Sequence, residues 1–202
     1  MKPINEANKM NDVNEPRRRF LVGATSFVAG AGLVGAAIPF IQSWNPSAKA
    51  RAAGAPVKVN ISKIEPGSMI TVEWQGKPVW ILRRTTENLD TLALDEHKEE
   101  LRDPASEVNQ QPDYARNPNR SIREDIFVAV GICTHLGCVP NYNPEGAVEV
   151  KHALFYCPCH GSKFDLAGRV YKGVPAPTNL IIPPHQYIDN SVLEIGADAK
   201  TS

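Results

Sequence analysis

Two short stretches of the sequence, CTHLGC at Cys133–Cys138 and CPCHGS at Cys157–Ser162, contain all four cysteines of the chain. Four clustered cysteines are too few and too concentrated to be a disulfide scaffold for 202 residues. Each stretch, here called a ligand box, pairs a cysteine with a nearby histidine and contains glycine or proline, which is typical of tight loops. The pattern indicates one site with sulfur and nitrogen ligands.

Cys133 with His135, and Cys157 with His160, are the candidate metal ligands. Two thiolates and two imidazoles suit a [2Fe-2S] cluster, whose reduced state is favoured when imidazoles replace two thiolates, with potentials of roughly −150 to +300 mV. Such potentials suit electron uptake from a quinol. The same four residues also suit a Cys2His2 zinc site, and composition alone does not distinguish the two metals.

Three residues beside these ligands have candidate supporting roles. Cys138 and Cys159 have no ligand role if the four ligand positions are filled, and a disulfide is their natural use. It would close a loop of about twenty residues, worth about 3 kcal/mol in the chain-entropy model. Ser162 is a candidate hydrogen-bond donor to the cofactor, which would stabilise an added electron.

An uncharged stretch at Phe20–Ile41 precedes this site. As a helix its about 22 residues would extend roughly 33 Å, enough to cross a bilayer. Arg17–Arg19 predict that residues 1–19 stay cytoplasmic and that the bulk of the chain lies on the other side. Arg17–Leu21 also resembles the twin-arginine export signal, from which Pro16 and Val22 depart. A cleaved signal, with processing near Ala48–Ala50, is the alternative.

Residues 42–56 read as a flexible hinge, and residues 57–202 as a small antiparallel β domain. Alternating or β-rich runs predict its strands at 57–61, 70–74, 78–82, 126–132, 148–156 and 192–196. Residues 89–101 have helix-compatible spacing, and residues 103–123 are expected to form a polar loop insertion. The equal totals of acidic and basic residues argue against a nucleic-acid partner.

The two boxes, the tethered apolar segment and Gly173–Pro177 (GVPAP) resemble the Rieske iron-sulfur subunit of bacterial cytochrome bc complexes. The resemblance implies a mainly β fold, a Rieske-type antiparallel sandwich with a cluster-binding subdomain at about 127–180, after one transmembrane helix. It implies one [2Fe-2S] cluster, with Cys133 and Cys157 on one iron and His135 and His160 on the other. It also implies a disulfide between Cys138 and Cys159.

The function implied by the resemblance is ubiquinol oxidation, transfer of one electron to a c-type cytochrome and coupled proton release. His160, together with His135, would be catalytic. Cytochrome b, a c-type cytochrome, ubiquinol and the membrane are the expected partners, in a dimeric complex. The inner membrane is the expected location, with residues 57–202 in the periplasm. The alternatives are a zinc-stapled periplasmic binding module and a Rieske subunit of another periplasmic oxidoreductase.

Three further expectations concern single positions. Leu136, beside a candidate ligand, is expected on the docking surface. Phe164 stands where many high-potential relatives have a tyrosine whose hydroxyl bonds a ligand cysteine, and we predict a lower potential for this chain. The remaining histidines have no cysteine partner, and we expect them at the surface without a role; they are His97, His152 and His185.

Overall fold

The computed structural model describes residues 14–48, 50, 54–147 and 149–198. The chain divides into two compact units, residues 1–50 and 51–202, which are described separately. Predictions that concern residues 1–13, 49, 51–53, 148 and 199–202 lie outside the described residues, and they include part of the hinge and most of the cytoplasmic segment.

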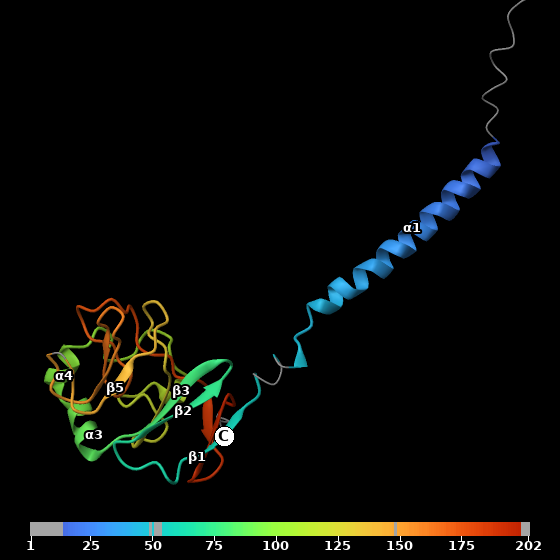
Figure 1. Cartoon of the computed structure of the whole chain (residues 1–202). Helices are drawn as coiled ribbons and strands as arrows, with labels where there is room; N and C mark the ends of the chain where they lie inside the picture. The colour runs from blue at the N-terminus through green and yellow to red at the C-terminus, as the bar shows by residue number, and fades with distance from the viewer. Residues whose placement is uncertain (1–13, 49, 51–53, 148, 199–202) are drawn as a thin grey trace, which may run out of the picture. The chain divides into compact units, whose positions relative to one another are not determined.

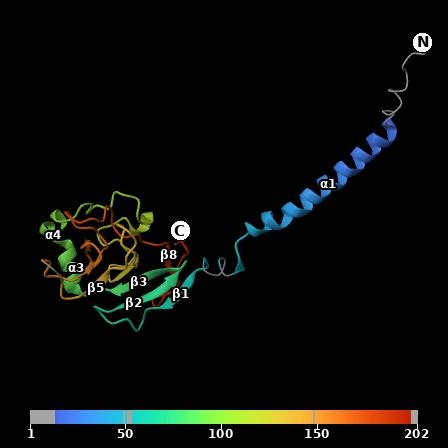
Figure 2. The same ribbon diagram turned by 45° about the horizontal axis from the view of Figure 1, so that its top comes forward.

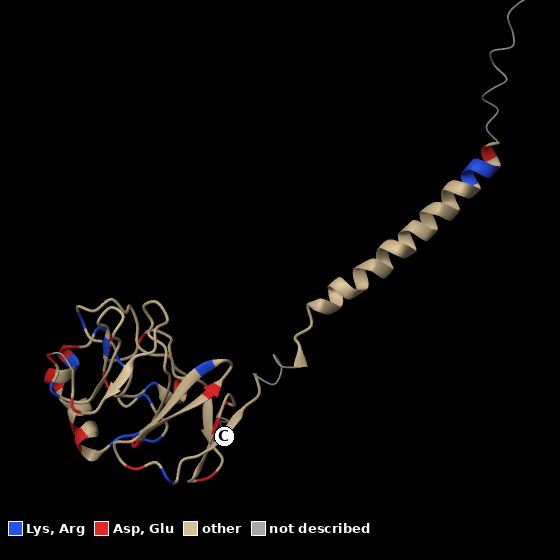
Figure 3. Cartoon of the chain, viewed as in Figure 1, with Lys and Arg blue, Asp and Glu red and all other residues tan. Residues whose placement is uncertain are grey.

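The first unit consists mainly of one long helix, α1 (Glu15–Ser43; Figure 1). The Asn14 side chain accepts a hydrogen bond from the Arg17 amide, and Pro16 occupies the first turn, where its missing N–H costs nothing. Charged residues are confined to the start of the helix (Figure 3), and its most apolar window has a mean hydropathy of 1.9. The helix is long and apolar enough to cross a membrane, and it contains the predicted span 20–41.

The described residues of the second unit form three antiparallel sheets of three strands each. Figure 1 and Figure 2 show β2 and β3 side by side in this unit. The terminal sheet has the order β1 (Val57–Asn60), β9 (Val192–Ile195), β8 (His185–Tyr187). The middle sheet has the order β2 (Met69–Trp74), β3 (Lys77–Arg83), β4 (Ile126–Val130). The box sheet has the order β5 (Asn141–Asn143), β6 (Leu154–Tyr156), β7 (Lys163–Phe164).

The middle sheet is covered on both faces. Along β3, Val79 and Ile81 belong to a hydrophobic cluster shared with the terminal sheet, whereas Trp80 and Leu82 belong to a second cluster that includes Phe155 of β6. Successive side chains of a strand point to opposite faces, so four consecutive apolar residues serve two cores. The expected antiparallel sandwich is confirmed, and the second core supports the box sheet.

Two predicted elements are interrupted. The helical stretch at 89–101 forms two short helices, α3 (Thr86–Ala93) and α4 (Asp95–Glu99), separated by Leu94, whose ψ of 133° is extended. In the predicted strand at 148–156, Leu154–Tyr156 form β6, whereas Val150 is bridged to Ala147 in a tight turn. Residues 103–123 are mostly irregular, with one 3-10 turn, η1 (Asp113–Ala115).

Candidate metal centre

The two ligand boxes have the same backbone hydrogen bonds. In the first box, the Cys133 amide donates to the Cys138 carbonyl (2.7 Å) and the Gly137 amide donates to the Cys133 carbonyl (3.1 Å). In the second, Cys157 donates to Ser162 (2.8 Å), and Gly161 donates back to Cys157 (3.0 Å).

Each glycine has a positive φ, 85° at Gly137 and 78° at Gly161, which a residue with a Cβ adopts only under strain. The two boxes therefore share one loop geometry.

Both candidate ligand cysteines are buried free thiols. Cys133 and Cys157 are each 2% exposed and neither forms a disulfide. Burial is the largest cause that raises the pKa of the Cys157 thiol, and the neighbouring Cys133 raises it further. The protein alone thus disfavours a thiolate here, and a bound cation would reverse this preference.

The two candidate ligand histidines lie side by side. The ring centroids of His135 and His160 are 4.8 Å apart, with the planes nearly perpendicular at 87°. His160 is exposed and His135 is half-buried, whereas the thiols lie inside. Sulfur and nitrogen donors are thus separated into an inner and an outer pair. Leu136, the residue after His135, is 71% exposed.

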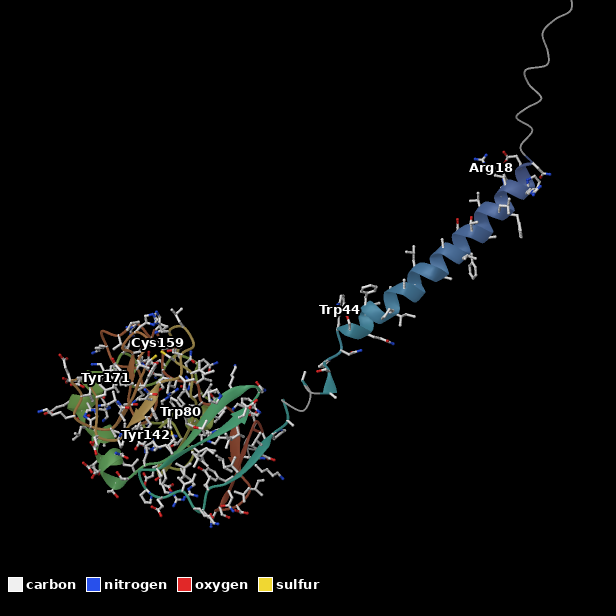
Figure 4. All side chains as sticks on the ribbon, in the orientation of Figure 1. Arg18, Trp44, Trp80, Tyr142, Cys159 and Tyr171 are labelled. Carbon is white, nitrogen blue, oxygen red and sulfur yellow. A yellow bond between two sulfur atoms is a disulfide. The ribbon has the colours of Figure 1, made fainter. Side chains whose placement is uncertain are left out.

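A disulfide joins Cys138 to Cys159, with 6.7 Å between their Cα atoms (Figure 4). It links the end of the first box to the middle of the second. The Sγ atoms of Cys138, Cys159 and Cys157 lie within 4.8 Å of one another. Two of these sulfurs are already used in the disulfide, so this trio is not a thiolate site. The disulfide therefore lies directly against the thiol of Cys157, a candidate ligand.

The segment at 174–178 is hydrogen-bonded to both boxes. The Thr134 hydroxyl donates to the Thr178 carbonyl (2.7 Å), and the Ala176 amide donates to Ser162 Oγ (3.0 Å). Because Ser162 Oγ accepts this bond, its own hydrogen remains available for a donor role. Thr134 was not identified from the sequence, since a threonine between two ligands has no distinguishing pattern.

The expectation that the other three histidines lie at the surface is wrong for two of them. His97 and His185 are 4% and 1% exposed, and His152 is half-buried, with its Nε2 2.8 Å from the Tyr171 hydroxyl. His97 Nε2 lies 3.1 Å from Asp165 Oδ2, and His185 Nδ1 lies 2.8 Å from the Pro183 carbonyl. These partners are distant in sequence or on the backbone, so no local pattern indicates them.

The donor set fits a [2Fe-2S] cluster with mixed ligands. Two buried thiols and two imidazoles come from two like loops, and each loop supplies one donor of each kind. Such a cluster needs two thiolates on one iron and two imidazoles on the other. The inner pair of sulfurs and the outer pair of nitrogens match this division.

Comparisons with known proteins give matches to both units of the chain. Residues 56–184 match the model of the Rieske [2Fe-2S] domain, and residues 7–47 match that of the "Ubiquitinol-cytochrome C reductase Fe-S subunit TAT signal". The chain is similar to the ubiquinol-cytochrome c reductase iron-sulfur subunit of Allochromatium vinosum, with 55% identity over 92% of this chain and 91% of the relative.

Other matches are more distant. The corresponding subunit of Blastochloris viridis is 41% identical, over 90% of this chain and 93% of the relative. A solved structure of a hyperthermophilic respiratory Complex III contains a chain that is 28% identical, with a TM-score of 0.47, over 87% of this chain and 98% of that one.

Proposed function

This chain belongs to the Rieske iron-sulfur subunits of ubiquinol-cytochrome c reductase, the cytochrome bc1 complex, and we propose that it oxidises ubiquinol and delivers the electron to a c-type cytochrome. The observation that carries the proposal is the arrangement of two buried free thiols behind two adjacent imidazoles, one of them exposed. The cluster could then hold an electron in the interior while a substrate binds at the surface.

Cys133 and Cys157 would hold one iron of the Rieske [2Fe-2S] cluster, and His135 and His160 the other. The burial of the sulfurs and the outward position of the histidines support this assignment. When bound, the cluster supplies one-electron redox chemistry at a potential within reach of a quinol. Ser162 would donate its hydroxyl hydrogen toward the cluster, because its oxygen already accepts the Ala176 amide.

His160 is proposed as the residue that meets ubiquinol. Its exposed ring could accept a hydrogen bond from a quinol hydroxyl through the ring nitrogen that does not bind iron, and it could keep the proton when the quinol gives up its electron. His135 lies against it and is half-buried, so it is the second candidate for this role. The exposed Leu136 would contact the protein that provides the quinol pocket.

The chain is membrane-anchored through α1. We propose that it lies in the inner membrane with its N-terminus in the cytoplasm, as Arg17–Arg19 favour, and its Rieske domain in the periplasm. The Cys138–Cys159 disulfide supports an oxidising compartment. Cytochrome b and a c-type cytochrome are the proposed partners in a dimeric complex, and residues 42–56 would be the hinge that lets the domain reach both.

The test is an electron paramagnetic resonance spectrum of the dithionite-reduced full chain, with iron and acid-labile sulfide counted on the same sample. We expect the low average g value of a histidine-ligated two-iron cluster and two of each atom per chain, as a [2Fe-2S] centre requires. A silent spectrum with stoichiometric zinc would show a zinc-stapled binding module instead. A Rieske signal that ubiquinol does not reduce would point to another periplasmic oxidoreductase.

A further inference from the structure

A buried carboxylate, Asp165, lies three positions after Ser162, the last residue of the second ligand box. Its Oδ1 accepts the amides of Ala167 (2.9 Å) and Arg169 (2.7 Å). Its Oδ2 accepts Arg169 Nε (2.7 Å) and lies 3.1 Å from His97 Nε2. Among the described residues, His97 is the only side chain outside the turn at 165–169 that bonds this carboxylate.

The charge states of this pair determine where the proton on His97 lies. Burial disfavours ionisation of Asp165, but the positive charge of Arg169 and the hydrogen bond from His97 outweigh it and lower the pKa of Asp165 to about 2. An ionised carboxylate only accepts hydrogen bonds, so His97 Nε2 must carry a proton. The contact therefore needs a donor at this position, and an apolar side chain of similar size could not replace it.

The turn at 165–169 continues into the second box through backbone contacts. The Asp165 amide donates to the Arg169 carbonyl (2.9 Å), and Phe164 is bridged to Val170. Lys163 and Phe164 form β7, which pairs with β6, the strand that leads directly to Cys157. A shift of the turn therefore moves β7 and the Ser162 carbonyl, which accepts the Cys157 amide.

The segment that carries His97 runs along the same turn. Arg169 Nη2 donates to the Leu92 carbonyl (3.3 Å), the Arg102 amide donates to the Val170 carbonyl (2.9 Å), and the Lys172 amide donates to the Glu100 carbonyl (2.8 Å). These bonds hold residues 92–102 against residues 169–172. His97 is the point at which this segment reaches the buried carboxylate.

We propose that His97 is a positioning residue for the second ligand box, which it orients by donating a hydrogen bond to Asp165. The inference rests on the proposed function, since the box is taken to hold the cluster. Helices α3 and α4 would then stabilise the second ligand box from outside it. His97 touches neither cluster nor substrate and acts only through the carboxylate.

The experiment compares His97→Leu, His97→Gln and a matched control, His185→Leu, in the full chain. His185 is also a buried histidine with one bonded and one unpartnered ring nitrogen among the described residues, but it lies on β8 and bonds the Pro183 carbonyl. The measurements are the g values of the reduced cluster, its midpoint potential and the rate of cluster loss on warming.

We expect His97→Leu to shift the g values and the potential and to speed cluster loss by about tenfold, because a charge-assisted buried hydrogen bond is lost. His97→Gln keeps a donor and should restore wild-type g values. His185→Leu should lower the melting temperature while the g values stay unchanged.

The inference is overturned if His97→Leu behaves as His185→Leu does, or if His97→Gln is as impaired as His97→Leu. Should His97→Leu hold no cluster at all, His97→Gln decides: wild-type g values support the inference, and altered ones contradict it. A wild-type chain without a Rieske signal means that the proposed function has failed, and the inference falls with it.

Discussion

The two ligand boxes have the same pattern of backbone hydrogen bonds, yet their histidines differ in exposure to solvent. His135 is half-buried and its loop is held by the Thr134 hydroxyl on Thr178, whereas His160 is exposed and its box is followed by the buried turn at Asp165. The first box ends at the disulfide, and the second contains it. The same loop geometry therefore occurs twice. The second box, whose histidine is exposed, is followed by the more extensive buried hydrogen-bond network, that of Asp165.

The largest expected effect is common to both boxes. Cys133→Ser and Cys157→Ser should each abolish the cluster, because each removes a thiolate from a set with no spare free cysteine. Iron, acid-labile sulfide and the reduced spectrum of each variant check this. A variant that kept a full complement of iron would show that its box does not hold the metal as proposed.

Removal of the disulfide should affect both boxes at once. In the double variant Cys138→Ser, Cys159→Ser, the free energy of unfolding should fall by about 3 kcal/mol, because a crosslink between residues 21 positions apart is lost. The cluster should also be lost faster on warming. Thermal unfolding with and without reductant measures this, and the variant should be insensitive to reductant, unlike the wild type.

Acid should lower stability through Asp165, the buried carboxylate that follows the second box. The folded pKa of Asp165, about 2, lies below its ordinary 3.8, so its contribution to stability is present above pH 3.8 and lost as the pH falls to about 2. The shift corresponds to a contribution on the order of 2 kcal/mol at neutral pH. Unfolding of wild type and Asp165→Asn across this range checks the sign: the stability difference should shrink with acid, and a constant difference would contradict the assignment.

The glycines test whether the two loops are equivalent. Gly137→Ala and Gly161→Ala should each lower the free energy of unfolding by about 1–2 kcal/mol, because both glycines have a positive φ. Steric conflict adds little: an added Cβ meets nothing within 4 Å at Gly137, and only the Tyr156 hydroxyl at 3.9 Å at Gly161. Denaturant titrations compare the two, and Gly76→Ala, also at positive φ in a turn away from the boxes, serves as a control for strain alone.

The smallest effect concerns potential rather than stability. Phe164, two positions after the second box, is fully buried and offers no hydroxyl. Phe164→Tyr should therefore raise the midpoint potential by about 60 mV, which is a tenfold change in the equilibrium constant of a one-electron couple. Redox titration measures it, with Phe155→Tyr, another buried phenylalanine of the box sheet, as the control. If the midpoint potential does not rise in Phe164→Tyr, a hydroxyl at this position does not control the potential of this chain.

Much of the molecule could be predicted from local patterns. The six-residue boxes specify a donor set because metal chemistry depends on residue type and short spacing, and an uncharged stretch long enough for a bilayer predicts the helix that α1 forms. β2, in which apolar and polar residues alternate, and β3, a short run of apolar residues, both formed where expected, because each pattern is readable from neighbouring residues alone.

Tertiary structure decided what depends on contacts between distant segments. The short strands β5, β7 and β8 have two or three residues each, too few for a period, and exist because a paired neighbour satisfies their backbone. His97 is buried because Asp165, 68 positions away, compensates its loss of water. The sequence by itself determined which atoms can bind the metal, because that is a property of side chains. Which histidine faces solvent, and what supports each loop, was decided only by packing, because burial is a property of the whole fold.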